Sequence, residues 1–351
     1  RVFYAVPESV PEAGIFRSLS PAAVSCLLDR HPDASLVIVT SPTYEGVISD
    51  IAGIAAECRR RNVPLLTDEA HGAHLGFGGF PASAVQSGAD ISVQSLHKTL
   101  AGLTQTAVVH LSGGLVDRAA VRRALAMFQT SSPSYLLSAS IDGCVRLLES
   151  DRTRLFENWQ QCIQLFRKRV SGLNSLRLLE KEPGMYALDP SKLVILTGRS
   201  GLSGAALQEL LRRRYRIETE MAAPTYTVAM TGIGDTLENL CALADALTEI
   251  DQSRSEAEPL PSLPVFSLPE KAMSAAEALA RPRESVPLAE AAGLVCGEYA
   301  MAYPPGIPLL VPGERISPEA LRLIGAYEAR GIRVRDTFGA LPSKIFVIPA
   351  V

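Results

Sequence analysis

Short apolar runs alternate with helix-forming segments over the first third of the sequence, and this alternation restricts the chain to few folds. Residues 36–41 (LVIVTS) and 63–67 (VPLLT) are rich in β-branched and apolar residues, which predicts two buried strands. Between them, residues 50–61 carry apolar residues at helical spacing. Two further strands are predicted over 89–94 and 106–111. Strand–helix–strand units this short predict right-handed crossovers and a largely parallel sheet.

The remainder of the chain is interpreted as a helical connection followed by two smaller α/β units. Helical periodicity runs through 115–128 and 135–173, and a Pro- and Ser-rich stretch at 251–270 is the best candidate linker. After it we expect a short helix, a loop over 302–314, a second helix and a terminal strand. The predicted domains are a major domain (1–175), a small α/β domain (176–255) and a C-terminal domain (264–351).

Composition and charge exclude several classes of protein. The formal net charge of -3 argues against a nucleic-acid binder held by bulk charge. No apolar run reaches the roughly 18 residues that a membrane span needs, and we expect no signal peptide. The six cysteines are scattered without a C-x-x-C pair, so we expect reduced thiols in a cytoplasmic protein and neither a disulfide framework nor a zinc site.

Polar residues follow the predicted strands, and Lys98 is the most unusual of them. It lies in QSLHKT (94–99), just behind Ser95 and His97. The carboxyl ends of parallel strands are where such sheets bind ligands. Partial burial would lower the pKa of a lysine there and allow its amine to form a Schiff base. The alternative is an ordinary solvated lysine after a strand.

Asp68, in TDEAHGAH (67–74), has two interpretations. It could cap a helix, or its carboxylate could pair with a heterocycle nitrogen. With His71 and His74 it also fits D-x-x-H-x-x-H, a spacing that could bind a metal. We expect no metal, because a metal site would leave Lys98 unexplained. The glycine clusters, such as GFGG at 76–79, are interpreted as turns because none matches a phosphate-binding loop.

Four short motifs, in this order and spacing, resemble those of the fold-type-I pyridoxal-phosphate enzymes. They are TSPTYEG (40–46), TDEAHGAH (67–74), QSLHKT (94–99) and SSPSYLL (131–137). Together with the loop YPPGIPLLVPGE (303–314), they resemble the ornithine/lysine/arginine decarboxylase family along nearly the whole chain. The resemblance implies an α/β, fold-type-I transferase-like fold. We expect a partial, mainly parallel sheet with flanking helices, followed by smaller C-terminal α/β domains.

The resemblance implies catalytic roles for three residues. Lys98 would bond covalently to pyridoxal 5'-phosphate. Asp68 would pair with the pyridine nitrogen of the cofactor and keep it protonated, so that the ring can accept electrons. His71 would lie near the phenolic oxygen of the ring, and Ala70 would pack against the ring face.

Other positions would bind the cofactor more peripherally or meet a neighbouring subunit. Ser95 and His97 would contact the phosphate, and Ser41 would line the cofactor or substrate side. Residues 132–135 would lie near a dimer interface, and the loop 303–308 would face the mouth of the active site. A homodimer or larger homo-oligomer is therefore expected, with no nucleic-acid or membrane partner.

The implied reaction is decarboxylation of a basic amino acid to its amine and carbon dioxide, a reaction of polyamine biosynthesis. The substrate would be arginine, lysine or ornithine. Its distal cation requires an acidic partner, for which the candidates are Glu45, Glu69, Glu298 and Glu314. Glu69 could instead face solvent, and Glu314 is expected to stabilise its own loop.

Family members carry two features ahead of the point that matches Arg1. One is a glycine- and serine-containing turn that opens a phosphate-binding helix, and the other is a histidine that stacks on the cofactor ring. We expect an N-terminal part to be absent from this sequence, which would weaken cofactor binding. The alternatives are therefore an inactive truncated paralogue, an acyl transferase, or an aminotransferase with Arg199 as a candidate for binding the substrate carboxylate.

Overall fold

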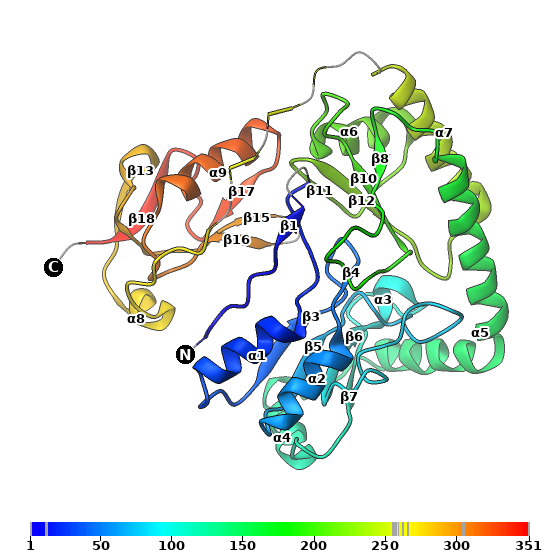
Figure 1. Cartoon of the computed structure of the whole chain (residues 1–351), viewed down its shortest axis with the longest axis horizontal. Helices are drawn as coiled ribbons and strands as arrows, with labels where there is room; N and C mark the ends of the chain where they lie inside the picture. The colour runs from blue at the N-terminus through cyan, green and yellow to red at the C-terminus, as the bar shows by residue number, and fades with distance from the viewer. Residues whose placement is uncertain are drawn as a thin grey trace.

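A four-stranded sheet in the order β3-β5-β6-β7 forms the centre of the N-terminal part of the computed structural model (Figure 1). β3 (Val37–Thr40), β5 (Leu65–Asp68) and β6 (Ile91–Ser95) are parallel, and β7 (Ala107–Leu111) runs antiparallel to β6. This mainly parallel sheet confirms the prediction from the sequence. The residues that the structure describes are 2–10, 13–254, 258, 260–261, 263–264, 267–303 and 306–349.

Helices α1 (Pro21–Arg30) and α2 (Ile51–Arg60) pack side by side against one face of this sheet. Val24 and Ile54 from the two helices share a buried cluster with Val39 of β3. Burying these branched side chains on a β-branched strand is the hydrophobic gain that fixes the crossover between β3 and β5. The Asp50 side chain accepts a hydrogen bond from the Gly53 amide and so caps α2.

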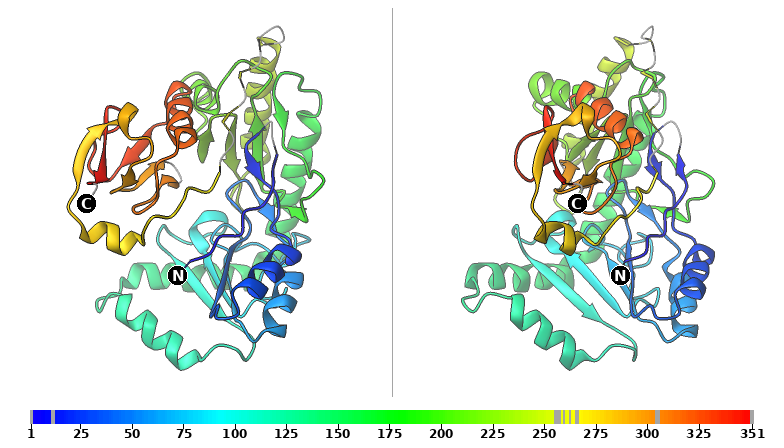
Figure 2. Two further views of the ribbon diagram at one scale, coloured as in Figure 1. Left: turned by 60° about the vertical axis from the view of Figure 1, so that its left-hand side comes forward. Right: turned by 90° about the vertical axis from the view of Figure 1, so that its left-hand side faces the viewer.

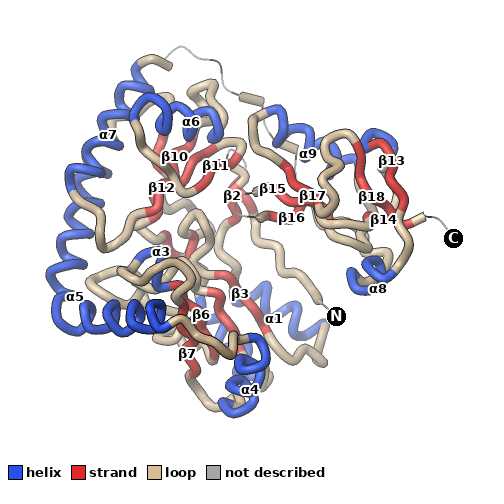
Figure 3. Tube along the Cα trace, turned by 180° about the vertical axis from the view of Figure 1, so that it is seen from behind, coloured by secondary structure: helices blue, strands red, loops and turns tan. Residues whose placement is uncertain are grey.

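The sheet is connected to the rest of the chain by three further helices. They are α3 (Leu96–Thr99), α4 (Arg118–Phe128) and α5 (Tyr135–Arg169). α5 is 35 residues long, and it passes the major sheet before running along the small domain (Figure 3).

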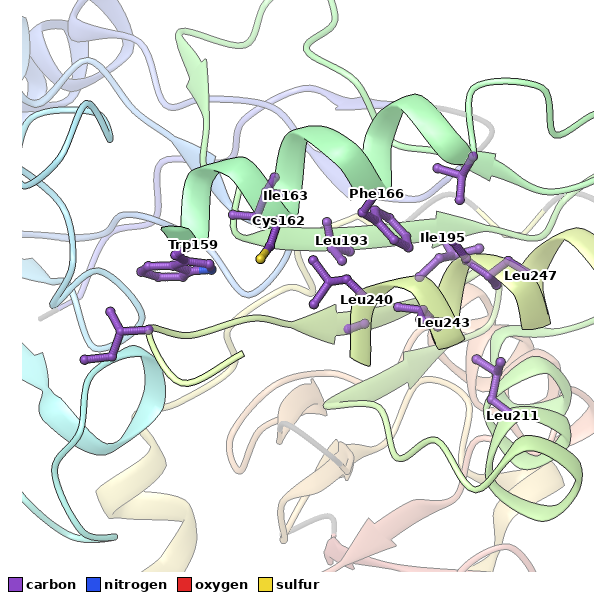
Figure 4. Close-up of a cluster of buried hydrophobic side chains, with 14 of the residues drawn as sticks. Trp159, Cys162, Ile163, Phe166, Leu193, Ile195, Leu211, Leu240, Leu243 and Leu247 are labelled. Atoms are coloured by element: carbon purple, nitrogen blue, oxygen red, sulfur yellow. The ribbon is translucent and has the colours of Figure 1, made fainter. Parts of the chain in front are cut away.

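The small domain is an antiparallel sheet in the order β11-β12-β10-β8, covered by two helices. Its strands are β8 (Arg177–Leu178), β10 (Lys192–Leu196), β11 (Met221–Ala223) and β12 (Tyr226–Met230), and its helices are α6 (Gly204–Tyr215) and α7 (Leu237–Gln252). Figure 4 shows Trp159 and Phe166 of α5 packed with Leu193 of β10 and Leu240 of α7. The Trp159 indole N–H donates to the Thr231 hydroxyl at 2.9 Å, so this buried ring has no unsatisfied polar atom.

Short strand pairs attach the N-terminal segment and the major domain to the small domain. β1 (Ser9–Val10) pairs with β2 (Ile15–Phe16), and β4 (Val47–Ile48) pairs with β9 (Ala187–Leu188). The second pair joins the turn after β3 to the strand that precedes β10, which brings the active-site edge of the major sheet against the small domain.

The C-terminal part contains two three-stranded sheets, β13-β18-β14 and β16-β15-β17, and lies beside the small domain (Figure 2). Its helices are α8 (Ala275–Ala280), η1 (Leu288–Glu290) and α9 (Pro318–Ala329). Its strands are β13 (Glu284–Pro287), β14 (Val295–Cys296), β15 (Ala300–Ala302), β16 (Ile307–Leu310), β17 (Val334–Asp336) and β18 (Lys344–Ile348). Ala222 of β11 belongs to the same buried cluster as Leu323 of α9, so this unit packs directly on the small domain.

The prediction of a loop over residues 302–314 is wrong in part. β16 lies within this stretch and pairs with β15, and Leu309 and Leu310 are buried in the C-terminal core. β16 is an edge strand, where Pro308 can be accommodated although it cannot donate a ladder hydrogen bond. The prolines of the motif therefore concealed a strand. Residues 304 and 305, in the loop expected to face the active site, lie outside the described residues.

Among the described residues, no helix is long and apolar enough to cross a membrane. In the same part of the chain, no three or more His, Cys, Asp or Glu side chains gather in an arrangement that could hold a metal ion. Asp68, His71 and His74 therefore do not form a metal site of this kind.

Candidate active site

Lys98 lies at the carboxyl end of the parallel sheet because α3 begins directly after β6. Its Nζ is 3.0 Å from Nε2 of His71 and 5.8 Å from the centre of the Tyr44 ring. Burial lowers the pKa of Lys98 below its usual range, while the negative charges of Asp68 and Glu220 partly oppose this shift. A half-buried amine with a lowered pKa exists in its neutral, nucleophilic form more often than a solvated lysine does.

His71 is 5% exposed, and its imidazole is the direct neighbour of this amine. Burial lowers the pKa of His71 to about 3, and the positive charges of Lys192 and Lys98 add to the effect. The ring is therefore neutral near pH 7. Its Nδ1 is buried and has no hydrogen-bond partner among the described residues. Because buried polar atoms are nearly always paired, this atom is available to a ligand oxygen or nitrogen.

Tyr44 completes the wall of the site, and it comes from the turn after β3. Its ring centre lies 4.2 Å from that of His71, with the two planes tilted by 54°. Its hydroxyl donates to Oε1 of Glu220 at 3.2 Å. Burial, together with Glu220, raises the pKa of Tyr44 to about 12. The hydroxyl thus stays protonated and holds Glu220 at the edge of the site.

Asp68, the last residue of β5, is half-buried, and its Oδ1 accepts from the Ala70 amide at 3.1 Å. The Ala70 carbonyl in turn accepts from the Ser95 amide at 3.3 Å, which links the ends of β5 and β6. The Asp68 carbonyl accepts from the Ser41 amide at 3.0 Å. These main-chain bonds bring the ends of three neighbouring strands to one edge.

The other residues predicted to bind the cofactor are held differently. The hydroxyl of Ser41 is buried and accepts from the Ser49 amide at 3.1 Å, so it stabilises the turn that carries Tyr44. Nδ1 of His97 lies 3.0 Å from the Thr106 carbonyl and therefore donates to it. The Ser95 side chain, at the start of α3, makes no capping hydrogen bond.

The four acidic candidates for the substrate cation already have protein partners. Glu69, which the sequence left as a possible solvent-facing residue, is 1% exposed instead. Its carboxylate accepts from the Ala84 amide, the Ser92 hydroxyl and the Gln94 amide group. The partners of the other three are the Tyr226 hydroxyl for Glu45, the Phe338 and Phe346 amides for Glu298, and the Val311 amide for Glu314.

Sequence reasoning missed two residues that act on Lys98 or His71. Glu220 comes from just before β11, and its only link to the site in the sequence is through the folded chain. Lys192 begins the otherwise apolar strand β10 and is 1% exposed. A lysine heading a fully buried strand is an anomaly, and it could have been noticed as one.

Two predicted peripheral features are on the surface. Residues 132–135 are exposed at the start of α5, where Tyr135 is 87% exposed. Arg199, the candidate for a substrate carboxylate in an aminotransferase, lies exposed in the turn after β10.

Comparison with known proteins agrees with this geometry. The Orn/Lys/Arg decarboxylase major domain matches residues 11–182, and the C-terminal domain of the same family matches residues 262–329. An arginine decarboxylase from Halalkalibacterium halodurans is 34% identical over 348 residues, which are 95% of this chain and 71% of that protein. An arginine decarboxylase from Bacillus subtilis is 35% identical over 326 residues, 91% of this chain and 66% of that protein.

The fold matches the crystal structure of the Francisella novicida lysine decarboxylase with a TM-score of 0.79 and 18% sequence identity, covering 99% of this chain and 63% of that one. The fold and the strand-end lysine define a protein of the fold-type-I class of α/β enzymes. Within that class, the chain belongs to the Orn/Lys/Arg decarboxylase family. It spans about two thirds of the length of these relatives.

Proposed function

We propose that this protein decarboxylates a basic amino acid, using pyridoxal 5'-phosphate bound through Lys98. The single observation that carries the proposal is the half-buried Lys98 amine, 3.0 Å from a neutral His71 at the end of a parallel sheet. Arginine is the first substrate to test, because the relatives of 34% and 35% identity are arginine decarboxylases. Lysine and ornithine are the other two candidates.

The residues at this edge of the sheet fit the cofactor. The lowered pKa of Lys98 suits an amine that bonds to an aldehyde, and the unpaired Nδ1 of His71 offers a donor to a ring oxygen. Asp68 would pair with the pyridine nitrogen, and Ala70 would pack on the ring. When bound, the cofactor supplies an electron sink for the breaking bond between Cα and the carboxylate.

The phosphate is assigned to Ser95 and His97 in this proposal. The free hydroxyl of Ser95 supports its part, and Nε2 of His97 is left over once Nδ1 donates to Thr106. Ser41 would act on the substrate side through its turn, since its own hydroxyl is used by Ser49.

The chain's own groups would orient the substrate and move protons. Lys98 can accept a proton when neutral and return it when charged, and His71 stays neutral beside it and preserves that balance. Glu220 presents a carboxylate held by Tyr44, and this negative charge suits the distal cation of a basic substrate.

The proposal extends to the organisation of the protein. The major domain (1–175) would hold the cofactor, with the small domain (176–255) and the C-terminal domain (264–351) placed around it, in a cytoplasmic homo-oligomer. Large apolar side chains at the end of α4 and the start of α5 support a subunit contact there. Those exposed by 70% or more are Met127, Phe128, Tyr135 and Leu136.

The test is to add pyridoxal 5'-phosphate, reduce with borohydride and map the adduct by peptide mass. A stable adduct at Lys98 that disappears in Lys98→Ala supports the cofactor assignment. Carbon dioxide release from arginine, lysine or ornithine then identifies the substrate. Labelling spread over exposed lysines, with none at Lys98, would reject the proposal.

A further inference from the structure

A buried ionic cluster lies at the junction of the small and major domains. The side chains of Asp189 and Lys192 are both 0% exposed, and Lys192 Nζ lies 3.2 Å from Oδ2 of Asp189. The other carboxylate oxygen, Oδ1, lies 3.1 Å from Nε2 of His74, whose ring is equally buried. Ser191 donates its hydroxyl to Oδ2 of Asp189 at 2.9 Å. The pair is therefore almost fully enclosed by polar partners.

This cluster is attached to the turn that carries Tyr44. The Asp189 amide donates to the Gly46 carbonyl at 2.7 Å, next to the pairing of β4 with β9. Gly46 has a φ of +87°, and a Cβ there would lie 2.8 Å from Cγ of Lys192. The lysine stem thus lies directly on the backbone two residues beyond Tyr44, at a distance that only glycine permits.

The same cluster is attached to the loop that carries His71. Lys192 Nζ donates to the His71 carbonyl at 3.4 Å, and Asp189 binds the ring of His74 three residues further on. A third link reaches the residue after Lys98. The Thr231 amide donates to the Ser191 carbonyl, and the Ile233 amide donates to the Thr99 carbonyl, each at 3.1 Å.

An ion pair with no exposed surface is a costly choice for stability alone. Removing two charges from water costs free energy that their attraction often fails to recover, and well-packed apolar residues would serve a buried strand at least as well. What the pair provides is a fixed set of directional bonds to two active-site loops. We propose that Lys192 and Asp189 are positioning residues that hold the rings of His71 and Tyr44 against Lys98, an inference that rests on the proposed function.

The charges around His71 are consistent with this role. Lys192 and Asp189 face it from the start of β10, Lys98 from α3 and His74 from its own loop, while Tyr44 covers it from the turn after β3. Among these, Lys192 is the strongest charged influence, and it lowers the pKa of His71 while Asp189 raises it.

The test compares Lys192→Met, which keeps the stem and removes the charge, with the surface control Lys168→Met. The first measurement is an NMR titration of the His71 ring in cofactor-free protein. We expect the pKa of His71 to rise from about 3 towards its ordinary value in Lys192→Met and to stay unchanged in the control. The second is the rate of pyridoxal phosphate trapping at Lys98, which we expect to fall about tenfold or more.

A folded Lys192→Met protein with wild-type His71 resonances and wild-type trapping would overturn the inference, because the pair would then serve the fold alone. Should that variant not fold, Lys192→Met/Asp189→Asn leaves no buried charge unpaired and is measured in the same way. In the wild-type protein, the Asp189 amide should exchange with solvent as slowly as the β10 core, and fast exchange would contradict the attachment to Gly46. The titration and the exchange need no cofactor, so their outcome is separate from failure of the proposed function, which shows as an unlabelled Lys98 in the wild type.

Discussion

Lys98 Nζ and His71 Nε2 lie 3.0 Å apart, in an arrangement in which each residue disfavours a positive charge on the other. Burial is the largest cause of the lowered pKa of both residues, and the charge of Lys98 adds to the shift of His71. A neutral imidazole is thereby kept beside an amine that can lose its proton. This polarity is what a Schiff-base lysine and its neighbour require.

Lys98 should react with amine reagents at lower pH than an ordinary lysine. Burial lowers its pKa, and each unit by which the pKa falls gives about tenfold more free amine at a fixed lower pH. We expect the rate of trace reductive methylation of Lys98 in cofactor-free protein to level off below the usual lysine value of about 10.4. Peptide mass mapping against the exposed Lys168 and Lys181 provides the internal reference. A rate still rising steeply at pH 10.4 would contradict a lowered pKa.

His71 should make the free energy of unfolding depend on pH between about 3 and 6.5. Its folded pKa is lowered to about 3, whereas the unfolded chain has the ordinary value of about 6.5. Between these values the unfolded state binds one more proton, so stability rises with pH and is lost as the pH falls. We expect His71→Asn to remove a slope of up to about 1.4 kcal/mol per pH unit from urea unfolding curves. Parallel wild-type and variant curves over this window would show that His71 takes up its proton in the folded state.

The sequence predicted the part of the fold whose contacts are local. β3, α2, β5 and β6 follow one another closely, and their hydrophobic periods alone specify a parallel βαβ arrangement. Because the ends of adjacent parallel strands share an edge, the proximity of Asp68, His71 and Lys98 follows from the same pattern.

The remaining site residues could not be predicted because distant packing brings them together. Tyr44 and Glu220 are 176 residues apart, and they meet only after an antiparallel sheet has folded on its own and packed against the major domain. Sequence periodicity does not report such contacts. Glu69 illustrates the opposite error, since its charge suggested solvent while its three hydrogen-bond donors permit burial.

Asp251 should be a stability determinant of the small domain. It is buried near the end of α7, and its carboxylate accepts from the amides of Asn174, Ser175 and Leu176. Removing it leaves three donors unsatisfied, so Asp251→Ala should lower the free energy of unfolding by about 3 kcal/mol. Asp245→Ala, on the same helix, loses only an exposed ion pair with Arg169 and should have a much smaller effect in the same urea titration. Equal losses in the two variants would refute this role.

Glu220 should act on Lys98 through its charge, and on the substrate if the proposed function holds. Its negative charge raises the pKa of Lys98, so Glu220→Gln should lower that pKa further and move the methylation profile to lower pH. The matched control is Glu218→Gln, two residues away, whose carboxylate is exposed and paired with Arg212. With arginine, lysine or ornithine as substrate, loss of a charged partner for the distal cation should raise KM by about tenfold or more, with a smaller change in kcat. A profile shifted as expected with KM unchanged would place Glu220 beside Lys98 but away from the distal cation, and identical behaviour of the two variants would remove it from the site altogether.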